Sequence, residues 1–385
     1  MDDSEEYDMN HLFRGHAIII ANEKFAGDTN RPGARQDANK MQALFQSLDF
    51  LVTTYMNVTA ADMMDIIRKG SKSFANLDAD CFVLVISSHG LEKPVFDSSL
   101  QGGSYMYLPK DSTVWRHALI GSDNKLIFVD EILKIFDDQE NKDSYLKGKP
   151  KLFFLQACRS GHLSYKNGIL GSYDTGTNVK VSISDTNLTN IQPSDAGYHD
   201  EDFIELVNSV AGIKLSQEAE NATDGMPVVG RVTYDYLKSP VVETDPVTPV
   251  TPRVMKQSAY DIVPVPCPDD CLIMYPTVPG KYAYRINQTG SYMLSYMFHH
   301  AHRNKLLRGC DILQYLTSVN NAMASTEIYF DPSAITVVPD EIKMLQESLP
   351  FKVTACIVHR LTKTLRFQPR STNSVWQELN ARRTF

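Results

Sequence analysis

CFVLVISSHG, at residues 81–90, and KLFFLQACRSG, at residues 151–161, are the two stretches that decide the fold. Each begins with an almost unbroken apolar run and ends abruptly in small and polar residues. Such runs are typical of strands that are covered on both faces, as in a parallel sheet. Parallel strands end at one edge of their sheet, where open α/β sheets bind ligands. We therefore expect His89 and Cys158, which follow these two strands, at the same edge.

Apolar runs of the same kind recur along the chain and alternate with helical patterns. Besides 81–87 and 151–156, strands are predicted at 16–22, 50–56, 271–275 and 355–359. Apolar residues at helical spacing predict helices at 36–48, 60–70, 129–136, 291–302 and 310–319. Thr59 is placed to cap the second of these helices, with Asp62 in its first turn. The alternation predicts an α/β fold with right-handed crossovers.

The stretch from about 160 to 268 breaks this rhythm. It is rich in Asp, Ser, Thr, Asn and Gly, and it contains ETDPVTPVTPR and IVPVPCPDD. Closely spaced prolines favour an extended conformation and interrupt regular secondary structure. The composition favours a surface linker, and a third folded unit is the alternative.

Composition narrows the classes of function. The chain has 385 residues, is 43% hydrophobic and carries a formal net charge of −8, which argues against bulk affinity for nucleic acid or anionic membranes. No apolar run approaches the ~20 residues of a transmembrane helix, and the acidic start MDDSEEYDMN is not a secretory signal. Six cysteines are far too few for a disulfide scaffold. We expect a protein of the reducing cytosol with a working thiol, no cofactor, and no nucleic-acid or membrane partner.

His89, Gly90 and Cys158 together suggest nucleophilic catalysis. An imidazole beside a thiol can support the thiolate and later protonate a leaving amine. The backbone N–H groups of Gly90 and Cys158 could form an oxyanion hole, because a glycine lets the backbone approach a substrate carbonyl closely. Each residue taken alone is also compatible with a packing role.

At these residues the chain resembles the caspases, cytosolic cysteine proteases that cut after aspartate. GKPKLFFLQACRSG (148–161) is similar to the caspase cysteine segment, which carries a Q-A-C signature. The other similar segments are RGHAIIIANEKF (14–25), RPGARQDANKMQALF (31–45), DCFVLVISSHG (80–90), DCLIMYPTVPGKYAYRINQTGSYM (270–293) and CIVHRLTKTLRF (356–367). The resemblance covers about 11–162 and 269–370.

The resemblance implies a fold and a domain organisation. The fold is an α/β/α sandwich with a mostly parallel six-stranded sheet flanked by helices. Residues 1–10 would be a short N-terminal peptide, 11–165 the large-subunit catalytic region, 166–268 the intersubunit linker, and 269–385 the small-subunit region, which forms one fold with the large subunit. The chain then resembles an executioner-type precursor with no long prodomain, or an initiator isoform that has lost its prodomain.

The resemblance also assigns roles to single residues. It implies that Cys158 is the nucleophile and His89 the general acid and base, that Gly90 contributes to the oxyanion hole, and that the carbonyl of Thr29 orients the imidazole. Metal ligands are not implied. The substrate-binding residues would be Arg31, Gln156 and Arg285 for the substrate aspartate, and Tyr284 and Tyr292 as aromatic walls.

The two arginines of the implied pocket suit the binding of a carboxylate. A buried carboxylate needs charge-assisted donors in fixed positions, and arginine supplies a bidentate fork. Arg31 and Arg285 would also repel a basic substrate side chain, which disfavours specificity for Lys or Arg. The resemblance therefore implies protein substrates with aspartate at the cleavage site.

Four features depart from the caspase pattern. Ser160 stands where a glycine usually follows the arginine, and Ala283 replaces a usual serine of the aspartate pocket. Ile286 stands where several caspases have an asparagine that helps to bind an acidic residue four places into the peptide, so we predict a weaker preference for an acid there. The stretch 91–124 is longer than the usual loop after the histidine.

The linker is expected to act as a switch, because caspases are cut there after aspartate. Asp195 and Asp224 are followed by small residues and are the leading candidates, and Asp174 is a third. Asp245 precedes a proline, which makes cleavage there unlikely. The resemblance further implies a homodimer of large–small pairs with 356–367 at or near the interface, an upstream caspase and caspase inhibitors as partners, and a role in programmed cell death.

Two other readings remain open. The departures at Ser160, Ala283 and 91–124 would suit a caspase-like pseudoprotease that regulates an active caspase by binding it. A structural zinc site is the second alternative. Its ligands would come from Cys267, Cys271, His299, His300 and His302, although their spacing matches no recognised finger.

Overall fold

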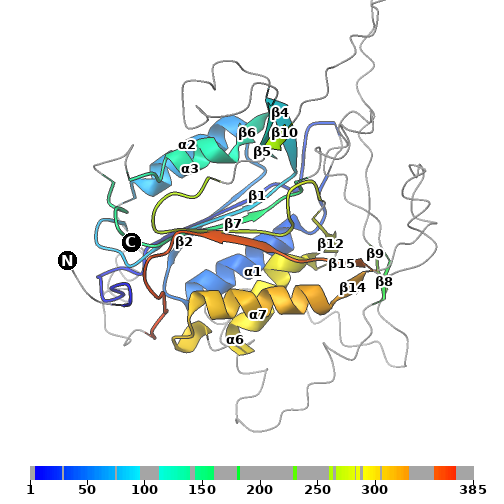
Figure 1. Ribbon diagram of the computed structural model, residues 1–385. Helices are drawn as coiled ribbons and strands as arrows, with labels where there is room; N and C mark the ends of the chain where they lie inside the picture. Colours follow the sequence, from blue (N-terminus) through cyan, green and yellow to red (C-terminus); the bar gives the residue numbers. More distant parts are fainter. Residues whose placement is uncertain are drawn as a thin grey trace, which may run out of the picture.

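A six-stranded sheet forms the centre of the molecule (Figure 1). The computed structural model describes residues 5–27, 30–73, 76–95, 112–138, 144–159, 180–182, 229–231, 260–262, 266–281, 283–286, 289–303, 306–328 and 351–369. The strand order is β16-β11-β7-β3-β1-β2. Neighbouring strands are parallel except at the β16 edge, where β16 is antiparallel to β11.

The six strands lie where the apolar runs predict them. Their bounds are β1 His16–Ala21, β2 Leu51–Met56, β3 Phe82–Ser87, β7 Lys151–Gln156, β11 Cys271–Tyr275 and β16 Cys356–His359. The strands β1, β3, β7 and β11 are buried along their whole length. Side chains of a strand alternate between its two faces. In β3, Val83 and Val85 thus join the core on one face, and Leu84 and Ile86 join the core on the other.

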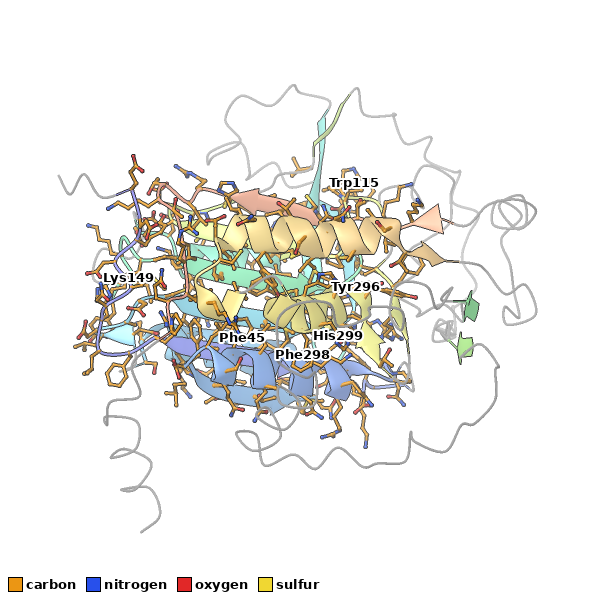
Figure 2. The ribbon with its side chains drawn as sticks, turned by 90° about the horizontal axis from the view of Figure 1, so that it is seen from below. Phe45, Trp115, Lys149, Tyr296, Phe298 and His299 are labelled. Atoms are coloured by element: carbon orange, nitrogen blue, oxygen red, sulfur yellow. The ribbon has the colours of Figure 1, made fainter. Side chains whose placement is uncertain are left out.

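Helices cover both faces of the sheet, so the predicted α/β/α sandwich is confirmed. One face carries α1 (Ala34–Ser47), α6 (Tyr292–Arg303) and α7 (Ile312–Ser325), and α6 lies between α1 and α7 and packs against both (Figure 2). The other face carries α2 (Ala60–Ser71) and α3 (Val129–Lys134). Thr59 caps α2 as predicted, since its side chain accepts a hydrogen bond from the backbone N–H of Asp62.

The bounds of the last predicted helix differ most from those in the structure. The predicted helix at 310–319 begins instead at Ile312, because Asp311 is its N-cap and accepts a hydrogen bond from the backbone N–H of Gln314. It continues to Ser325, past the polar pair that follows Val319 in the sequence. Met323, one helical turn beyond Val319, is buried in the same core. Asn320 also accepts a hydrogen bond from the backbone N–H of Ala355 at 2.7 Å, so tertiary contacts support the helix through a stretch with a weak apolar pattern.

A second sheet was not predicted. It has the order β10-β5-β4, with β6 also paired to β5, and its strands are β4 Gly90–Val95, β5 Ser112–Ile120, β6 Leu126–Phe128 and β10 Tyr260–Ile262. The sequence of β4 contains a lysine followed by a proline, so it gave no strand pattern. It is a strand because its neighbour β5 pairs with it along Gly90–Val95. The stretch 91–124, which is longer than the usual caspase loop after the histidine, thus contains most of β4 and all of β5.

The predicted linker also contains short strands. β10 pairs in parallel with β5 at Ser112–Val114. β8 Lys180–Ser182 and β9 Val229–Arg231 also lie within the predicted linker. Short elements beyond it are β12 Arg285–Ile286, β13 Gly290–Ser291, the 3-10 helix η3 Leu306–Arg308, β14 Glu327–Ile328 and β15 Phe351–Lys352. Asp174, Asp195 and Asp224 lie outside the described residues. Among the helices that the structure describes, none is long and apolar enough to cross a membrane.

A buried ion pair lies at the edge of the sheet where β1 and β3 begin. The Nη1 of Arg14 lies 2.9 Å from the Oδ2 of Asp80, and both side chains are almost completely buried. The Nε of Arg14 donates a hydrogen bond to the carbonyl of Leu48 at 3.1 Å. This ion pair therefore ties together segments that lead into β1, β2 and β3.

Candidate active site

The sheet register brings the two predicted catalytic residues to one edge. The last residues of β3 and β7, Ser87 and Gln156, are paired with each other. The ladder continues one residue further, because the backbone N–H of Ser88 donates to the carbonyl of Gln156 at 3.1 Å. His89 and Cys158 each follow two residues after their paired strand ends. The register thus places both at the carboxyl edge of adjacent strands, as predicted.

Gly90 approaches the cysteine segment closely. A Cβ atom at position 90 would lie 2.8 Å from the carbonyl oxygen of Cys158 and 2.7 Å from the Cβ of Ala157. Both distances are shorter than real Cβ contacts allow, so only glycine fits here. The backbone of Gly90 therefore lies directly beside the predicted nucleophile.

His89 is held in a buried position. Its side chain packs against Phe25, with ring centroids 4.5 Å apart and tilted by 52°. The carbonyl of His89 accepts a hydrogen bond from the backbone N–H of Ile120 at 2.9 Å. The His89 ring thus contacts the loop after β1, while its backbone is hydrogen-bonded to β5. Thr29, predicted to orient it, lies outside the described residues.

The Cys158 side chain is completely buried and contacts a backbone segment from the other side of the linker. Its Sγ accepts a hydrogen bond from the backbone N–H of Ala283 at 2.8 Å and lies 3.6 Å from the carbonyl oxygen of the same residue. The sequence suggested that Ala283 removes a hydroxyl from the substrate pocket. In the structure its main chain covers the thiol.

Arg31 belongs to a buried polar network at the same edge. Its side chain is 1% exposed. Its Nη1 donates to the hydroxyl of Ser87 at 3.2 Å and to the carbonyl of Asn22 at 3.4 Å. The Ser87 hydroxyl in turn donates to the Oδ2 of Asp37 at 2.8 Å. Arg31 is thus fixed next to the last residue of β3.

Arg285 is joined to the same network through its hairpin partner. On β12 it pairs with Ser291 of β13. The backbone N–H and the hydroxyl of Ser291 donate to the Oδ1 of Asp37 at 2.7 and 3.0 Å. Burial raises the pKa of Asp37, while the Ser291 bond and the charge of Arg31 act in the opposite direction. One buried carboxylate therefore links the positions of the two predicted pocket arginines.

The remaining pocket residues lie near this network. Gln156 is 1% exposed, and its Oε1 has no hydrogen-bond partner among the described residues. The backbone N–H of Tyr292 donates to the carbonyl of Tyr284 at 3.3 Å. The Tyr292 ring is buried and stacks on Tyr296 of α6 with centroids 6.3 Å apart. The side chain of Ile286 lies outside the described residues, so its predicted effect on subsite preference stays a prediction.

Sequence reasoning missed a second buried network behind Cys158. The guanidinium of Arg159 lies 2.9 Å from the Oε1 of Glu92 and stacks over the ring of Tyr275 at 4.5 Å. The Nε2 of His117 lies 3.2 Å from the carbonyl oxygen of Cys158. Glu92 and His117 come from β4 and β5, which the sequence did not reveal. The only available signal was Arg159, which directly follows the cysteine.

The proposed zinc ligands are not brought together. Cys267 and Cys271 pack with the core on the α2 and α3 face of the sheet, whereas His299 and His300 lie on α6 on the opposite face. The Sγ of Cys267 contacts the carbonyls of Cys271 and Val358 instead. Within the described ranges, no group of three or more His, Cys, Asp or Glu side chains is placed to hold a metal ion. The zinc alternative fails because the sheet separates its ligands.

The family model of the caspase domain, peptidase family C14, matches residues 14–365. The chain belongs to the caspase family. Human caspase-10 is 32% identical over 153 residues, which is 40% of this chain and 24% of that protein. Chicken caspase-2 is 30% identical over 149 residues, 38% of this chain and 29% of that protein. The aligned part of the chain thus spans less than a third of these two relatives.

Two longer alignments cover more of the chain. Mouse caspase-6 is 26% identical over 225 residues, which is 58% of this chain and 70% of that protein. The crystal structure of caspase-1 from Spodoptera frugiperda aligns with a TM-score of 0.54 at 20% identity, covering 96% of this chain and 98% of that one. This likeness confirms the caspase-like fold. The family consists of cysteine peptidases.

Proposed function

We propose that this chain is a cysteine endopeptidase that cleaves peptide bonds after aspartate. The observation that carries the proposal is the β3–β7 register, which puts His89 and Cys158 at one edge of the sheet, where the buried Arg31 donates to Ser87, the last residue of β3. Asp37 links Ser87 to Ser291, the hairpin partner of the buried Arg285. A thiol and an imidazole at one edge supply acyl transfer. Two buried arginines supply recognition of a carboxylate.

The chemistry follows from these positions. The Sγ of Cys158 attacks the scissile carbonyl after His89 takes its proton, and the new oxyanion accepts hydrogen bonds from the N–H groups of Gly90 and Cys158. His89 then protonates the leaving amine, and a water molecule activated by His89 hydrolyses the thioester. The guanidinium groups of Arg31 and Arg285, with the amide of Gln156, bind the substrate aspartate. Tyr284 and Tyr292 contact the neighbouring substrate residues.

We propose further that the uncut chain is a precursor. The backbone of Ala283 lies on the Sγ of Cys158, so a substrate carbonyl has to displace this segment before it reaches the thiol. Ala283 lies at the start of the proposed small subunit, fifteen to twenty residues beyond the proline-rich end of the linker. Cutting at Asp195, Asp224 or Asp174 would free that segment to move. This is an order–disorder switch of a common type.

The assembly and its setting are part of the proposal. β16 is the edge strand of the sheet, and the outer side of an edge strand can pair with a second copy. This supports a homodimer of large–small pairs. All six cysteines are free thiols, which supports the reducing cytosol. Protein substrates, an upstream caspase, caspase inhibitors and a role in programmed cell death follow from the family.

A second function is favoured by the same covered thiol. If Ala283 keeps its place on Cys158 after the linker is cut, the chain is a pseudoprotease that acts by binding an active relative. This reading predicts that neither substrate nor an aspartyl electrophile reaches the thiol of the cut protein.

Peptidase activity of the purified chain separates the two functions. A recognition site for an unrelated protease replaces the sequence around Asp195, so that the linker can be cut on demand. Four peptides differ only in the residue before the scissile bond, which is Asp, Glu, Asn or Arg. We expect cleavage after Asp alone, after the cut, and no cleavage by Cys158→Ala. A cut protein that hydrolyses none of the peptides and is not labelled by an aspartyl electrophile would refute the peptidase.

A further inference from the structure

The strands β4 and β5 contact two consecutive residues, Cys158 and Arg159, in the loop that follows β7. Glu92 and His117 are cross-strand partners. Glu92 forms the ion pair with Arg159, and the Nε2 of His117 lies 3.2 Å from the carbonyl oxygen of Cys158. All of these side chains are buried. Neighbouring side chains of one β-ladder thus contact neighbouring residues of the loop that carries the predicted nucleophile.

The direction of the His117 hydrogen bond is fixed by chemistry. A carbonyl oxygen only accepts, so the Nε2 of His117 has to carry the proton. Burial and the charge of Arg159 lower the pKa of His117 to about 3, so the ring stays neutral at physiological pH. The Nδ1 lone pair has no hydrogen-bond partner among the described residues. His117 also lines a cavity of about 10 Å³ together with Arg116, Asp130 and Tyr275.

The Cys158 carbonyl is held from two sides. His117 donates to it, and the backbone of Gly90 packs against it so closely that a Cβ there would be 2.8 Å away. Fixing this oxygen fixes the backbone of Cys158, and with it the direction of the Cα–Cβ bond and of the residue's own N–H. These are the groups that attack the substrate and stabilise the oxyanion in the proposed function.

We propose that His117 is a positioning residue for the nucleophile, which donates its Nε2–H to the carbonyl of Cys158 and so fixes the backbone that presents the thiol and the oxyanion N–H. This inference rests on the proposed peptidase activity. Among the described residues, His117 contacts the carbonyl of Cys158 and the ring of Tyr275, neither of which belongs to the proposed aspartate pocket. Its loss should therefore slow the chemical step and leave substrate binding unchanged.

Two substitutions in the full, linker-cut chain test the role. His117→Leu fills a similar volume but donates nothing, whereas His117→Gln places an amide N–H near the position of Nε2. We expect kcat of the leucine variant to fall about 10- to 100-fold with KM within about twofold, because small misplacements of reacting groups cost rates of this order. The glutamine variant should recover most of the loss.

His16 provides the matched control. It is also buried and its Nε2 contacts a side chain, the hydroxyl of Thr53 at 2.8 Å, but it lies at the start of β1, at the opposite edge of the sheet. His16→Leu and His16→Gln should shift the melting temperature without lowering kcat. Equal kcat losses at both positions, or full kcat in a folded His117→Leu, would overturn the proposal.

A second readout does not depend on activity. In the chain labelled with ¹⁵N-histidine, the His117 ring should be the Nε2–H tautomer, with a ring proton that exchanges slowly with solvent. An Nδ1–H tautomer refutes the inference even if His117→Leu fails to fold. An inactive wild-type chain with the Nε2–H tautomer would refute the peptidase while the hydrogen bond stands, so the two failures are distinguishable.

Discussion

Substitution of Asp37 gives the sharpest test of the proposed aspartate pocket. The Asp37 carboxylate accepts three hydrogen bonds, two from Ser291 and one from Ser87, and so joins the positions of Arg285 and Arg31. Asp37→Ala leaves these donors buried with no acceptor. A buried donor that loses its partner costs ~1–3 kcal/mol. Since the two Ser291 donors share one oxygen, we expect a total loss of about 3–5 kcal/mol in unfolding free energy.

Asp37→Asn should have a smaller effect. The amide oxygen can still accept both bonds from Ser291. The amide NH₂ then faces the hydroxyl of Ser87, which already accepts from Arg31, so the hydroxyl proton loses its acceptor. One lost hydrogen bond corresponds to about 1–2 kcal/mol. Burial already raises the pKa of Asp37 and thus disfavours its charged form, which places the asparagine variant at the lower end of that range.

Activity and stability are measured side by side. Urea unfolding gives the free energies, and kcat/KM is measured on the peptide with Asp before the scissile bond. We expect kcat/KM of Asp37→Asn to fall about tenfold, which is what ~1.4 kcal/mol corresponds to, mainly through KM, and Asp37→Ala to lose selectivity for Asp over Asn. Asp65→Asn is the control, because the Asp65 side chain is 56% exposed and forms an ion pair with the exposed Lys69 on α2. A folded Asp37→Ala with unchanged stability and selectivity would refute this account of the pocket.

Three further predictions concern stability and pH. Asp80→Asn removes the negative charge that lies 2.9 Å from the buried Arg14 guanidinium, so unfolding free energy should drop by about 3–5 kcal/mol in urea, and a drop below ~1 kcal/mol contradicts the role of the pair. The folded-state pKa of His117 is lowered from 6.5 to about 3, so unfolded chains take up a proton that folded chains do not. The contribution of His117 to the unfolding free energy should therefore be complete above pH 6.5 and should fall by ~1.4 kcal/mol per pH unit as the pH falls toward 3. Urea titrations at several pH values should show no such loss for His117→Gln. If the wild type and the variant lose the same stability per pH unit, the prediction is contradicted. Gly290→Ala puts a Cβ 2.4 Å from the Oδ1 of Asp37, at a residue whose φ is +90°. It should therefore destabilise the protein by more than ~1 kcal/mol and raise KM. An unchanged melting temperature and KM would contradict this prediction.

The sequence predicted the central sheet because its strands are buried on both faces. A run such as FVLVIS has few other stable conformations in water, and its apolar side chains fill both cores. The same runs predicted that His89 and Cys158 share an edge. Arg31 and Arg285 were found through the resemblance to caspases, because an isolated arginine carries no signal of burial.

The missed features depend on contacts between distant parts of the chain. The Asp37 carboxylate meets Ser291, 254 residues away, and no spacing rule connects them. β4 has a weak strand pattern and owes its conformation to pairing with β5. Ala283 contacts Cys158 through its backbone, so the identity of its side chain could not reveal the contact. Long-range polar networks and main-chain contacts are the parts of this site that only the structure supplies.

The adjacency of β7 and β11 has a kinetic consequence. The two strands lie on opposite sides of the proposed linker, yet they form a parallel ladder from Cys271–Lys151 to Met274–Phe154 inside the sheet. A molecule cut in the linker holds together through this ladder and the cores around it. Once unfolded, however, its two pieces have to find each other by diffusion, because the tether that made their encounter intramolecular is gone. Refolding of the cut protein would then be second order in concentration, and each cut molecule would be a metastable assembly that, once lost at low concentration, does not return.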